Sequence, residues 1–289
     1  MMKMKTNVTG LGSKQLELLS REEIEAFFKK SRQWELAPTL SMGGSVIFPH
    51  TLIRTCGDQV AATVLGCLDS GADRVIALGV LHTLDREHIR SARIKALKGE
   101  DISKEACWGI SGPYFPGDQT WKAEYSLQNF KFLWDYEVEK RGLKNPPELI
   151  LAYICLANKE PWKLPGMEQL KSYLPNSIIV GTTDFCHYGK AYNTPPEQIL
   201  PISVEAEQFS RSTIEQGLKF FARQSYSDYL QYCYETNSDG SDVGQVLMYL
   251  KGPLKAHILE TKLIDVASLF EGNPEPSWVA ASLIQMTPT

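Results

Sequence analysis

Apolar and polar positions follow two different periods along the chain. Short, nearly continuous apolar runs predict buried strands at residues 45–50, 74–82, 148–157, 177–183, 257–266 and 277–286. Runs with a period near 3.6 predict helices at residues 20–32, 56–71, 126–142, 204–221, 225–236 and 243–252. Strands that alternate with helices indicate an α/β fold, an αβα sandwich with a mostly parallel central sheet. No repeat or long linker interrupts the pattern, so residues 1–289 are predicted to form a single domain.

The first predicted helix carries a start signal. Ser20 is placed to act as N-cap and Glu23 to complete a capping box, while Ile24 and Phe28 fall on one apolar face. Residues 108–121 are rich in glycine, proline and aromatic side chains and predict a long ordered loop.

Composition narrows the function classes. The 289 residues are 43% hydrophobic and include 30 basic and 34 acidic residues, for a net charge of -4. This balance argues against nucleic acid or an anionic membrane surface as the main partner. No apolar run approaches a membrane span of about 20 residues, and the first residues, MMKMKTNVTGLGSKQ, lack the apolar core of a signal peptide. The six cysteines form no C-x-x-C pair, and Cys67 and Cys155 fall in apolar stretches typical of a core. A cytoplasmic protein with reduced thiols is the simplest expectation.

Three of the five histidines follow apolar runs. His50, His82 and His187 lie at or near the ends of three predicted strands, whereas His88 and His257 do not. Ligands of open α/β sheets bind at the carboxyl ends of the strands. The three imidazoles could therefore converge on one cleft, and imidazole binds Fe, Cu, Zn and Ni.

A metal held by histidines usually needs a further protein ligand. The acidic residues that could supply it are Asp184, Glu124, Asp239 and Asp242. The last two lie in an acid-rich turn before a predicted helix, where a carboxylate is also typical of an N-cap.

Several stretches, in order, resemble the Memo family. "FPHT" is similar to its "PHAG", "LGVLHT" to its "LGPSHH", "AEYSLQNF" to its "EHSIEMH", and "SDGSDVGQVLM" falls where the family has "CGRHPIGVLL". The most specific likeness is that of "TTDFCHYGKAY" to "SSDFCHWGQRF". The likeness runs from about residue 40 to the C-terminus, and the first 40 residues form a divergent, partly helical segment without the family's "HAGSWY" motif.

The resemblance implies a fold similar to class III extradiol ring-cleaving dioxygenases, with a metal cleft. Carried over by position, it implies His50 and His82 as metal ligands and His187 as a nearby acid/base group. The family's third ligand, a cysteine, corresponds here to Asp239. A carboxylate with two histidines is the facial triad of non-haem Fe(II) oxygenases, so we expect Fe(II), with Cu or Zn as alternatives.

The resulting hypothesis is an oxygenase that acts on O₂ and a small molecule, with an aromatic compound as one option. The rival hypotheses are a non-catalytic Memo-type binding or scaffold protein with a vestigial metal cleft, and a Zn-dependent hydrolase. Exposed sheet edges could also support a homodimer.

Other residues near the predicted metal cleft have candidate roles. Asp184 could orient His187 or hydrogen-bond a metal ligand. Tyr125 could line the pocket and hydrogen-bond substrate. Trp121, Tyr114 and Phe115 could form an apolar wall or pack within their loop. Cys186 is expected to point away from the cleft, because adjacent residues of an extended segment face opposite sides.

Overall fold

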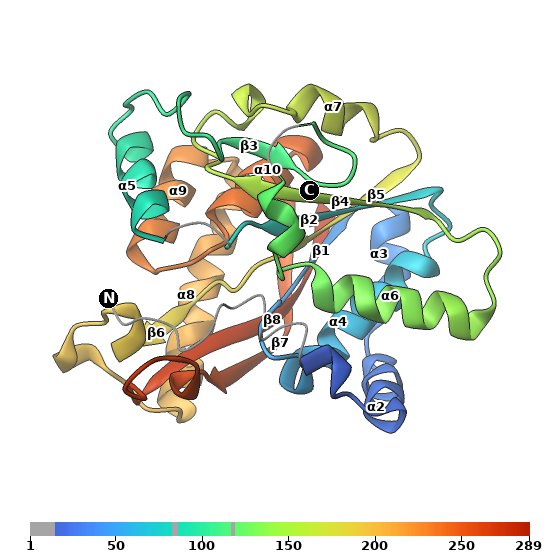
Figure 1. The fold of residues 1–289 in the computed structure, drawn as a ribbon, viewed down its shortest axis with the longest axis horizontal. Coiled ribbons are helices and arrows are strands. Elements are labelled where there is room, and N and C mark those ends of the chain that lie inside the picture. Colours follow the sequence, from blue (N-terminus) through green and yellow to red (C-terminus); the bar gives the residue numbers. More distant parts are fainter. Residues whose placement is uncertain (1–14, 83–85, 117–118) are drawn as a thin grey trace.

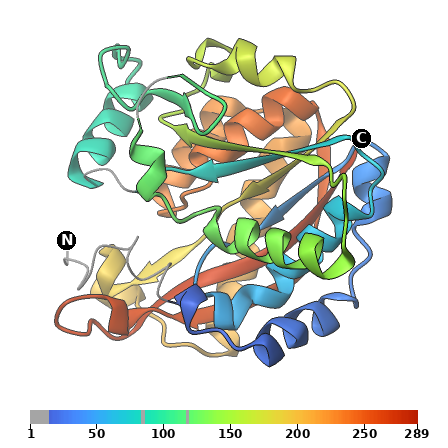
Figure 2. The same cartoon turned by 45° about the vertical axis from the view of Figure 1, so that its right-hand side comes forward.

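The computed structural model describes residues 15–82, 86–116 and 119–289 of the chain. It shows an α/β fold around a mixed sheet of eight strands, with helices on both faces (Figure 1, Figure 2). The strands are β1 (Ser45–Phe48), β2 (Arg74–Val80), β3 (Gly109–Ser111), β4 (Glu148–Cys155), β5 (Ser177–Thr182), β6 (His187–Gly189), β7 (Leu254–Asp265) and β8 (Ser277–Pro288). The longer helices are α2 (Arg21–Ser31), α4 (Ile53–Leu68), α5 (Arg86–Leu97), α6 (Gln128–Arg141), α8 (Val204–Arg223), α9 (Tyr226–Glu235) and α10 (Ser241–Lys251).

The centre of the sheet is parallel and its margins are antiparallel. The strand order is β3-β4-β2-β5-β1-β8-β6, with β7 paired to β8. The four strands β4, β2, β5 and β1 run parallel, whereas β3, β6, β7 and β8 pair antiparallel with their neighbours. The predicted α/β class with a parallel centre is therefore confirmed. The two late strands were predicted as elements, and the structure shows that they form a long antiparallel hairpin.

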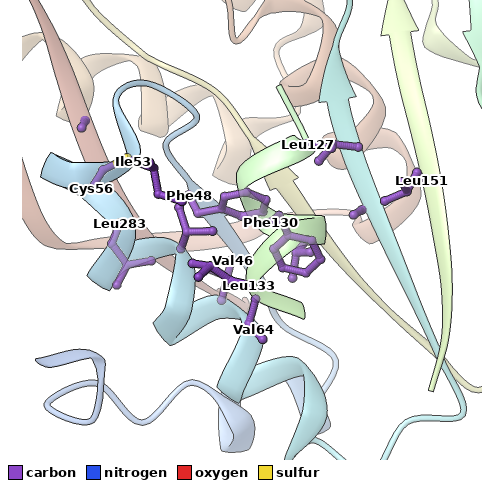
Figure 3. Close-up of a cluster of buried hydrophobic side chains, with 14 of the residues drawn as sticks. Val46, Phe48, Ile53, Cys56, Val64, Leu127, Phe130, Leu133, Leu151 and Leu283 are labelled. Carbon is purple, nitrogen blue, oxygen red and sulfur yellow. The ribbon is translucent and has the colours of Figure 1, made fainter. Parts of the chain in front are cut away.

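Strand residues divide between two apolar cores because successive side chains point to opposite faces of a sheet. In β1, Val46 and Phe48 enter the core beneath α2, α4 and α6, while Ile47 enters the core beneath α8, α9 and α10. Phe48 stacks on Phe130 of α6 with ring centroids 5.0 Å apart (Figure 3). Burial on both faces explains why these strands read as continuous apolar runs.

The register of the parallel strands brings their carboxyl ends to one edge. Phe48 of β1 pairs with Thr182 of β5, and Leu78 of β2 pairs with Gly181 of β5. The residues that follow β1, β2 and β5 are therefore neighbours in space although they are far apart in sequence.

Every predicted helix and strand is present, with bounds within three residues of those expected. The capping box of α2 is confirmed, since Ser20 and Glu23 exchange both hydrogen bonds. The pattern missed α5, because its sequence is dominated by charged residues, and the short elements α3 (Ala37–Ser41), α7 (Met167–Ser172), β3 and β6. The predicted loop at 108–121 contains β3 and the 3-10 turn η1 (Thr120–Ala123), and its residues 117–118 lie outside the described residues.

The described residues before β1 form α2 and α3. Residues 1–14, where the sequence shows no signal-peptide core, lie outside the described residues. Within the described ranges, no helix is both long and apolar enough to cross a membrane.

Candidate metal centre

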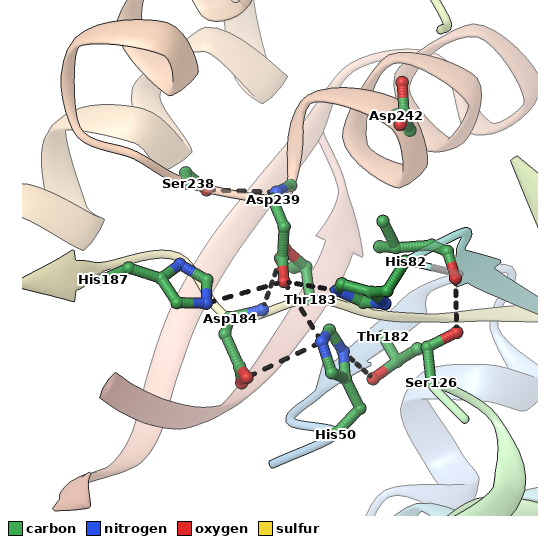
Figure 4. A network of polar contacts seen from close by, with 12 residues as sticks. His50, His82, Ser126, Thr182, Thr183, Asp184, His187, Ser238, Asp239 and Asp242 are labelled. Carbon is green, nitrogen blue, oxygen red and sulfur yellow. Dashed lines mark hydrogen bonds and ion pairs between the residues drawn. The ribbon is translucent and has the colours of Figure 1, made fainter. Parts of the chain in front are cut away.

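Three imidazoles and two carboxylates converge at the carboxyl edge of the sheet (Figure 4). His50 follows β1, His82 follows β2, Asp184 follows β5 and His187 opens β6, while Asp239 lies in the turn before α10. In two overlapping groups, His50–His82–Asp239 and Asp184–His187–Asp239, the ligand atoms all lie within 4.8 Å of one another. These buried His/Asp groups could hold a metal ion.

One oxygen of Asp239 is the meeting point of the three rings. Its Oδ2 lies 3.1 Å from Nε2 of His50, 3.4 Å from Nε2 of His82 and 3.8 Å from Nε2 of His187. The structure thus brings together the three histidines that the sequence placed at strand ends and the carboxylate that it aligned with the Memo-family cysteine.

The other oxygen of Asp239 is already engaged. Its Oδ1 accepts hydrogen bonds from Thr183 Oγ1 at 2.6 Å and from the backbone N–H of Asp184 at 2.8 Å. These two donors fix the carboxylate plane and leave only Oδ2 facing the rings. Asp239 is therefore arranged to bind a cation through one oxygen, which suits a single ion rather than a carboxylate-bridged pair.

The tautomer of His50 is set by its neighbour on β5. Thr182 donates its hydroxyl proton to the carbonyl of Phe48 at 2.9 Å, so its oxygen is left to accept from His50 Nδ1, 3.1 Å away. With the proton on Nδ1, a neutral His50 presents the lone pair of Nε2 to the cluster. Partners of this kind orient metal-binding histidines in proteins.

Glu124 supports His82 in the same way. Its Oε1 lies 3.0 Å from His82 Nδ1 and accepts the backbone N–H groups of Tyr125 at 2.8 Å and Ser126 at 2.9 Å, and its Oε2 accepts the backbone N–H of His82. These donors occupy the carboxylate. Glu124, one of the alternative third ligands, is thus placed to position His82 rather than to reach the cluster.

His187 is oriented by backbone. Its Nδ1 donates to the carbonyl of Asn237 at 2.8 Å, which leaves Nε2 facing Asp239. Asp184 was expected to orient either His187 or a metal ligand, but the group that accepts the orienting hydrogen bond of His187 is the carbonyl of Asn237. The Oδ2 of Asp184 instead faces Nε2 of His50 at 3.6 Å.

The second oxygen of Asp184 has no hydrogen-bond partner among the residues that the structure describes. Its Oδ1 is buried, and burial raises the pKa of this carboxyl above its ordinary value. An unpaired buried carboxylate oxygen is costly unless a cation or a proton accompanies it. The donor set and this orphaned oxygen together fit a bound metal ion at the cluster.

Asp242 lies apart from the cluster, as Figure 4 shows. Its carboxylate forms an ion pair with Arg93 of α5, with Oδ2 2.5 Å from Nη2, and accepts the backbone N–H of Ala157 at 2.9 Å. The same guanidinium donates to Ser241 Oγ. Of the two acids in this turn, only Asp239 faces the histidines.

The charges of the cluster are strongly coupled. Burial lowers the pKa of His82, but the carboxylates of Glu124 and Asp239 outweigh burial and raise that pKa to about 10. Burial would raise the pKa of Asp239, but His50 and the other rings hold it well below its usual range. For His187, burial prevails and lowers the pKa. A cation at Nε2 would replace the protons that the carboxylates attract there.

The cluster opens into a cavity of about 300 Å³. The aromatic ring of Tyr125 lines it and stacks on His82, with ring centroids 4.8 Å apart. The rest of the wall is largely apolar and includes Leu52, Leu81, Ile89, Ala191, Val266, Leu269 and Val279. Most of these come from loops and from α5, which the apolar pattern did not single out.

The structure shows where the three loop aromatics and Cys186 lie relative to the cavity. Trp121, Tyr114 and Phe115 are absent from the lining of this cavity, so of the two alternatives the structure favours packing. Trp121 stacks on Tyr153, and the other two pack near Tyr173. Cys186 is buried in the core beneath α8–α10, where burial raises its thiol pKa to about 12. It faces away from the cleft, as the alternation of an extended segment predicts.

Sequence reasoning missed the residues that orient the rings. Thr182 is a polar residue at the end of an apolar strand run, which is a signal that could have identified it, and its buried hydroxyl lies beside a strand-end histidine. Asn237 acts through its carbonyl oxygen, so its side chain carries no signal. Arg93 lies in a charged run that reads as a solvated surface.

Comparison of the chain with protein-family models and with curated proteins finds no match.

Proposed function

We propose that this protein is a metal-dependent oxidoreductase with a single Fe(II) ion bound by His50, His82 and Asp239. The observation that carries the proposal is the convergence of three Nε2 atoms on one carboxylate oxygen, with each ring oriented through its Nδ1 by a separate acceptor. Two imidazoles and one monodentate carboxylate form the ligand set of non-haem Fe(II) oxygenases. The resemblance to the Memo family and to class III extradiol dioxygenases is consistent with this set.

The bound ion would supply the electrons that activate O₂. The residues around it have tasks that follow from their positions. His187, whose lowered pKa keeps the ring neutral near neutrality, can accept a proton from a substrate hydroxyl at Nε2. Asp184 can hold a second proton, since burial favours its neutral form. Tyr125 lines the cavity beside His82 and can orient a flat substrate.

A second candidate function is hydrolysis with Zn(II) at the same position. It is favoured by the third ring, because Nε2 of His187 faces the same oxygen of Asp239 as the other two. A three-histidine set with one open position is typical of catalytic zinc. A third possibility is a non-catalytic Memo-type scaffold with a vestigial metal cleft.

Metal analysis of protein purified without added metal and without a histidine tag is the first test. We expect one ion per chain in the wild type and its loss in His50→Ala and Asp239→Asn. His257→Ala is the matched control, because His257 is exposed on β7. Full metal content in both site variants would refute the ligand set.

Oxygen uptake after anaerobic loading with Fe(II) separates the functions. The proposal expects consumption of O₂ with a small aromatic substrate, and a His187→Gln variant that keeps its metal but loses turnover. Ester hydrolysis that requires Zn(II), without oxygen uptake, would instead support the hydrolase. A loaded protein that is inactive in both assays would support the scaffold.

A further inference from the structure

We infer that the cavity binds a small carboxylic acid whose carboxylate pairs with Arg90 while its other end faces the metal centre. The position of the second end rests on the proposed function, whereas the anion site at Arg90 does not. The inference combines the position of α5, the charges of the cavity wall and the apolar surface between them.

One face of α5 forms part of the cavity wall. Ile89, Arg90 and Arg93 all line the cavity, and their spacing of three and four residues places them on the same side of the helix. Arg93 attaches α5 to the start of α10 through Asp242 and Ser241. The helix therefore holds Arg90, one turn before Arg93, at a fixed place beside the cavity.

The two arginines differ in their partners. The guanidinium of Arg93 is largely buried, and its charge is compensated by Asp242. The side chain of Arg90 is exposed, and its guanidinium forms no hydrogen bond or ion pair with any residue within the described ranges. The acids that line the cavity, Asp184 and Asp239, face the histidines instead. Among the described lining residues, Arg90 is thus the one cationic side chain without an acidic partner.

An open guanidinium has a specific chemical complement. Its planar fork of N–H donors matches the two oxygens of a carboxylate. The cavity also presents neutral polar side chains such as Asn129 and Asn193, and a single unpaired arginine suits a monoanion better than a phosphate, which usually recruits several donors. The apolar walls and the ring of Tyr125 suit a hydrocarbon or aromatic body, and a cavity of about 300 Å³ admits a small molecule only.

The test compares binding of 4-hydroxybenzoate with that of its uncharged amide, 4-hydroxybenzamide, by calorimetry. Both ligands are titrated into wild-type protein with and without bound Zn(II), which serves as a redox-inert ion. We expect the acid to bind at least tenfold more tightly than the amide in the wild type. Arg90→Gln should abolish this preference and leave amide binding unchanged. Arg32→Gln, which removes an exposed arginine at the end of α2, should have no effect.

Each outcome bears on one part of the reasoning. Equal affinity for acid and amide in the wild type, the absence of binding by both, or an acid preference that survives Arg90→Gln would overturn the inference. Tighter binding of phenyl phosphate than of the acid would show that the anion is a phosphate and would also overturn it. Loss of metal binding with an intact, Arg90-dependent acid preference would refute the proposed function alone.

Discussion

The support that Glu124 gives to His82 can be tested with one isosteric change, Glu124→Gln. Among the described residues, the donors to this carboxylate include Nδ1 of His82 and the backbone N–H groups of His82, Tyr125 and Ser126. A glutamine amide keeps only one acceptor oxygen and places an NH₂ group where the other oxygen was. At least one buried donor then faces another donor, and the His82 ring loses part of its anchor.

The size of the effect follows from these contacts. Glu124 is buried, with 1% of its surface exposed, so water cannot replace the lost acceptor. One unsatisfied buried donor costs about 1–3 kcal/mol of the free energy of unfolding. Loss of a group that orients a metal-binding histidine typically weakens metal affinity about 10–100-fold, which corresponds to about 1.4–2.7 kcal/mol.

The assay is competition for Zn(II) with a chromophoric chelator, together with urea unfolding of the metal-free protein. The matched control is Glu137→Gln. Glu137 is also buried, pairs with Arg141 at 2.8 Å and lies on α6 away from the cluster, so its loss should lower stability without changing Zn(II) affinity. The reasoning is refuted if Glu124→Gln binds Zn(II) as tightly as the wild type, or if both variants lose the same affinity.

Two further predictions concern stability. Burial would raise the pKa of Asp58, but its ion pairs with Lys262 at 2.5 Å and Lys30 at 2.7 Å lower the pKa overall. The ionised carboxylate therefore contributes to the free energy of unfolding above the pKa of the unfolded state. This contribution is lost as the pH falls through the lower pKa of the folded state. Asp58→Asn should lower the free energy of unfolding by about 1–3 kcal/mol at neutral pH, and the variant and the wild type should be equally stable in acid. Urea unfolding across pH measures both, and a difference in stability that does not change with pH would contradict this prediction. A Cβ added at Gly181 would lie 2.6 Å from Cγ1 of Val243 on α10. Gly181→Ala should therefore cost about 1–3 kcal/mol, and adding Val243→Ala should recover part of that cost in thermal unfolding; no recovery would mean that the strain lies elsewhere.

Local patterns were sufficient to predict much of the fold. The apolar runs of β1, β2, β4 and β5 predicted a parallel, doubly covered centre, because strands buried on both faces lack polar alternation. The same patterns could not assign α5, because its charged sequence gives little periodic signal. They also could not predict that β7 pairs with β8, because strand pairing depends on how the strands are arranged in the folded protein. The fold predicted from the resemblance, that of class III dioxygenases, remains a prediction.

The candidate site was predictable in part for a similar reason. Strand ends at one edge of a parallel sheet must be neighbours, so His50, His82 and His187 could be grouped from sequence. The choice between Asp239 and Asp242 was left open, because both lie in one turn and only side-chain direction separates them. In the structure Asp242 forms an ion pair with Arg93, whereas Asp239 faces the histidines.

The sequence by itself determined which segments are strands and helices and which reactive side chains follow them, because hydrophobic periodicity and strand ends are local properties of the chain. Only the tertiary structure decided which nitrogen of each ring faces the cluster, which carboxylate oxygen is available, and which arginine remains without an acid. These properties depend on hydrogen-bond partners such as Thr182, Glu124 and Asn237, which approach from distant parts of the chain only when the sheet and its helices have assembled.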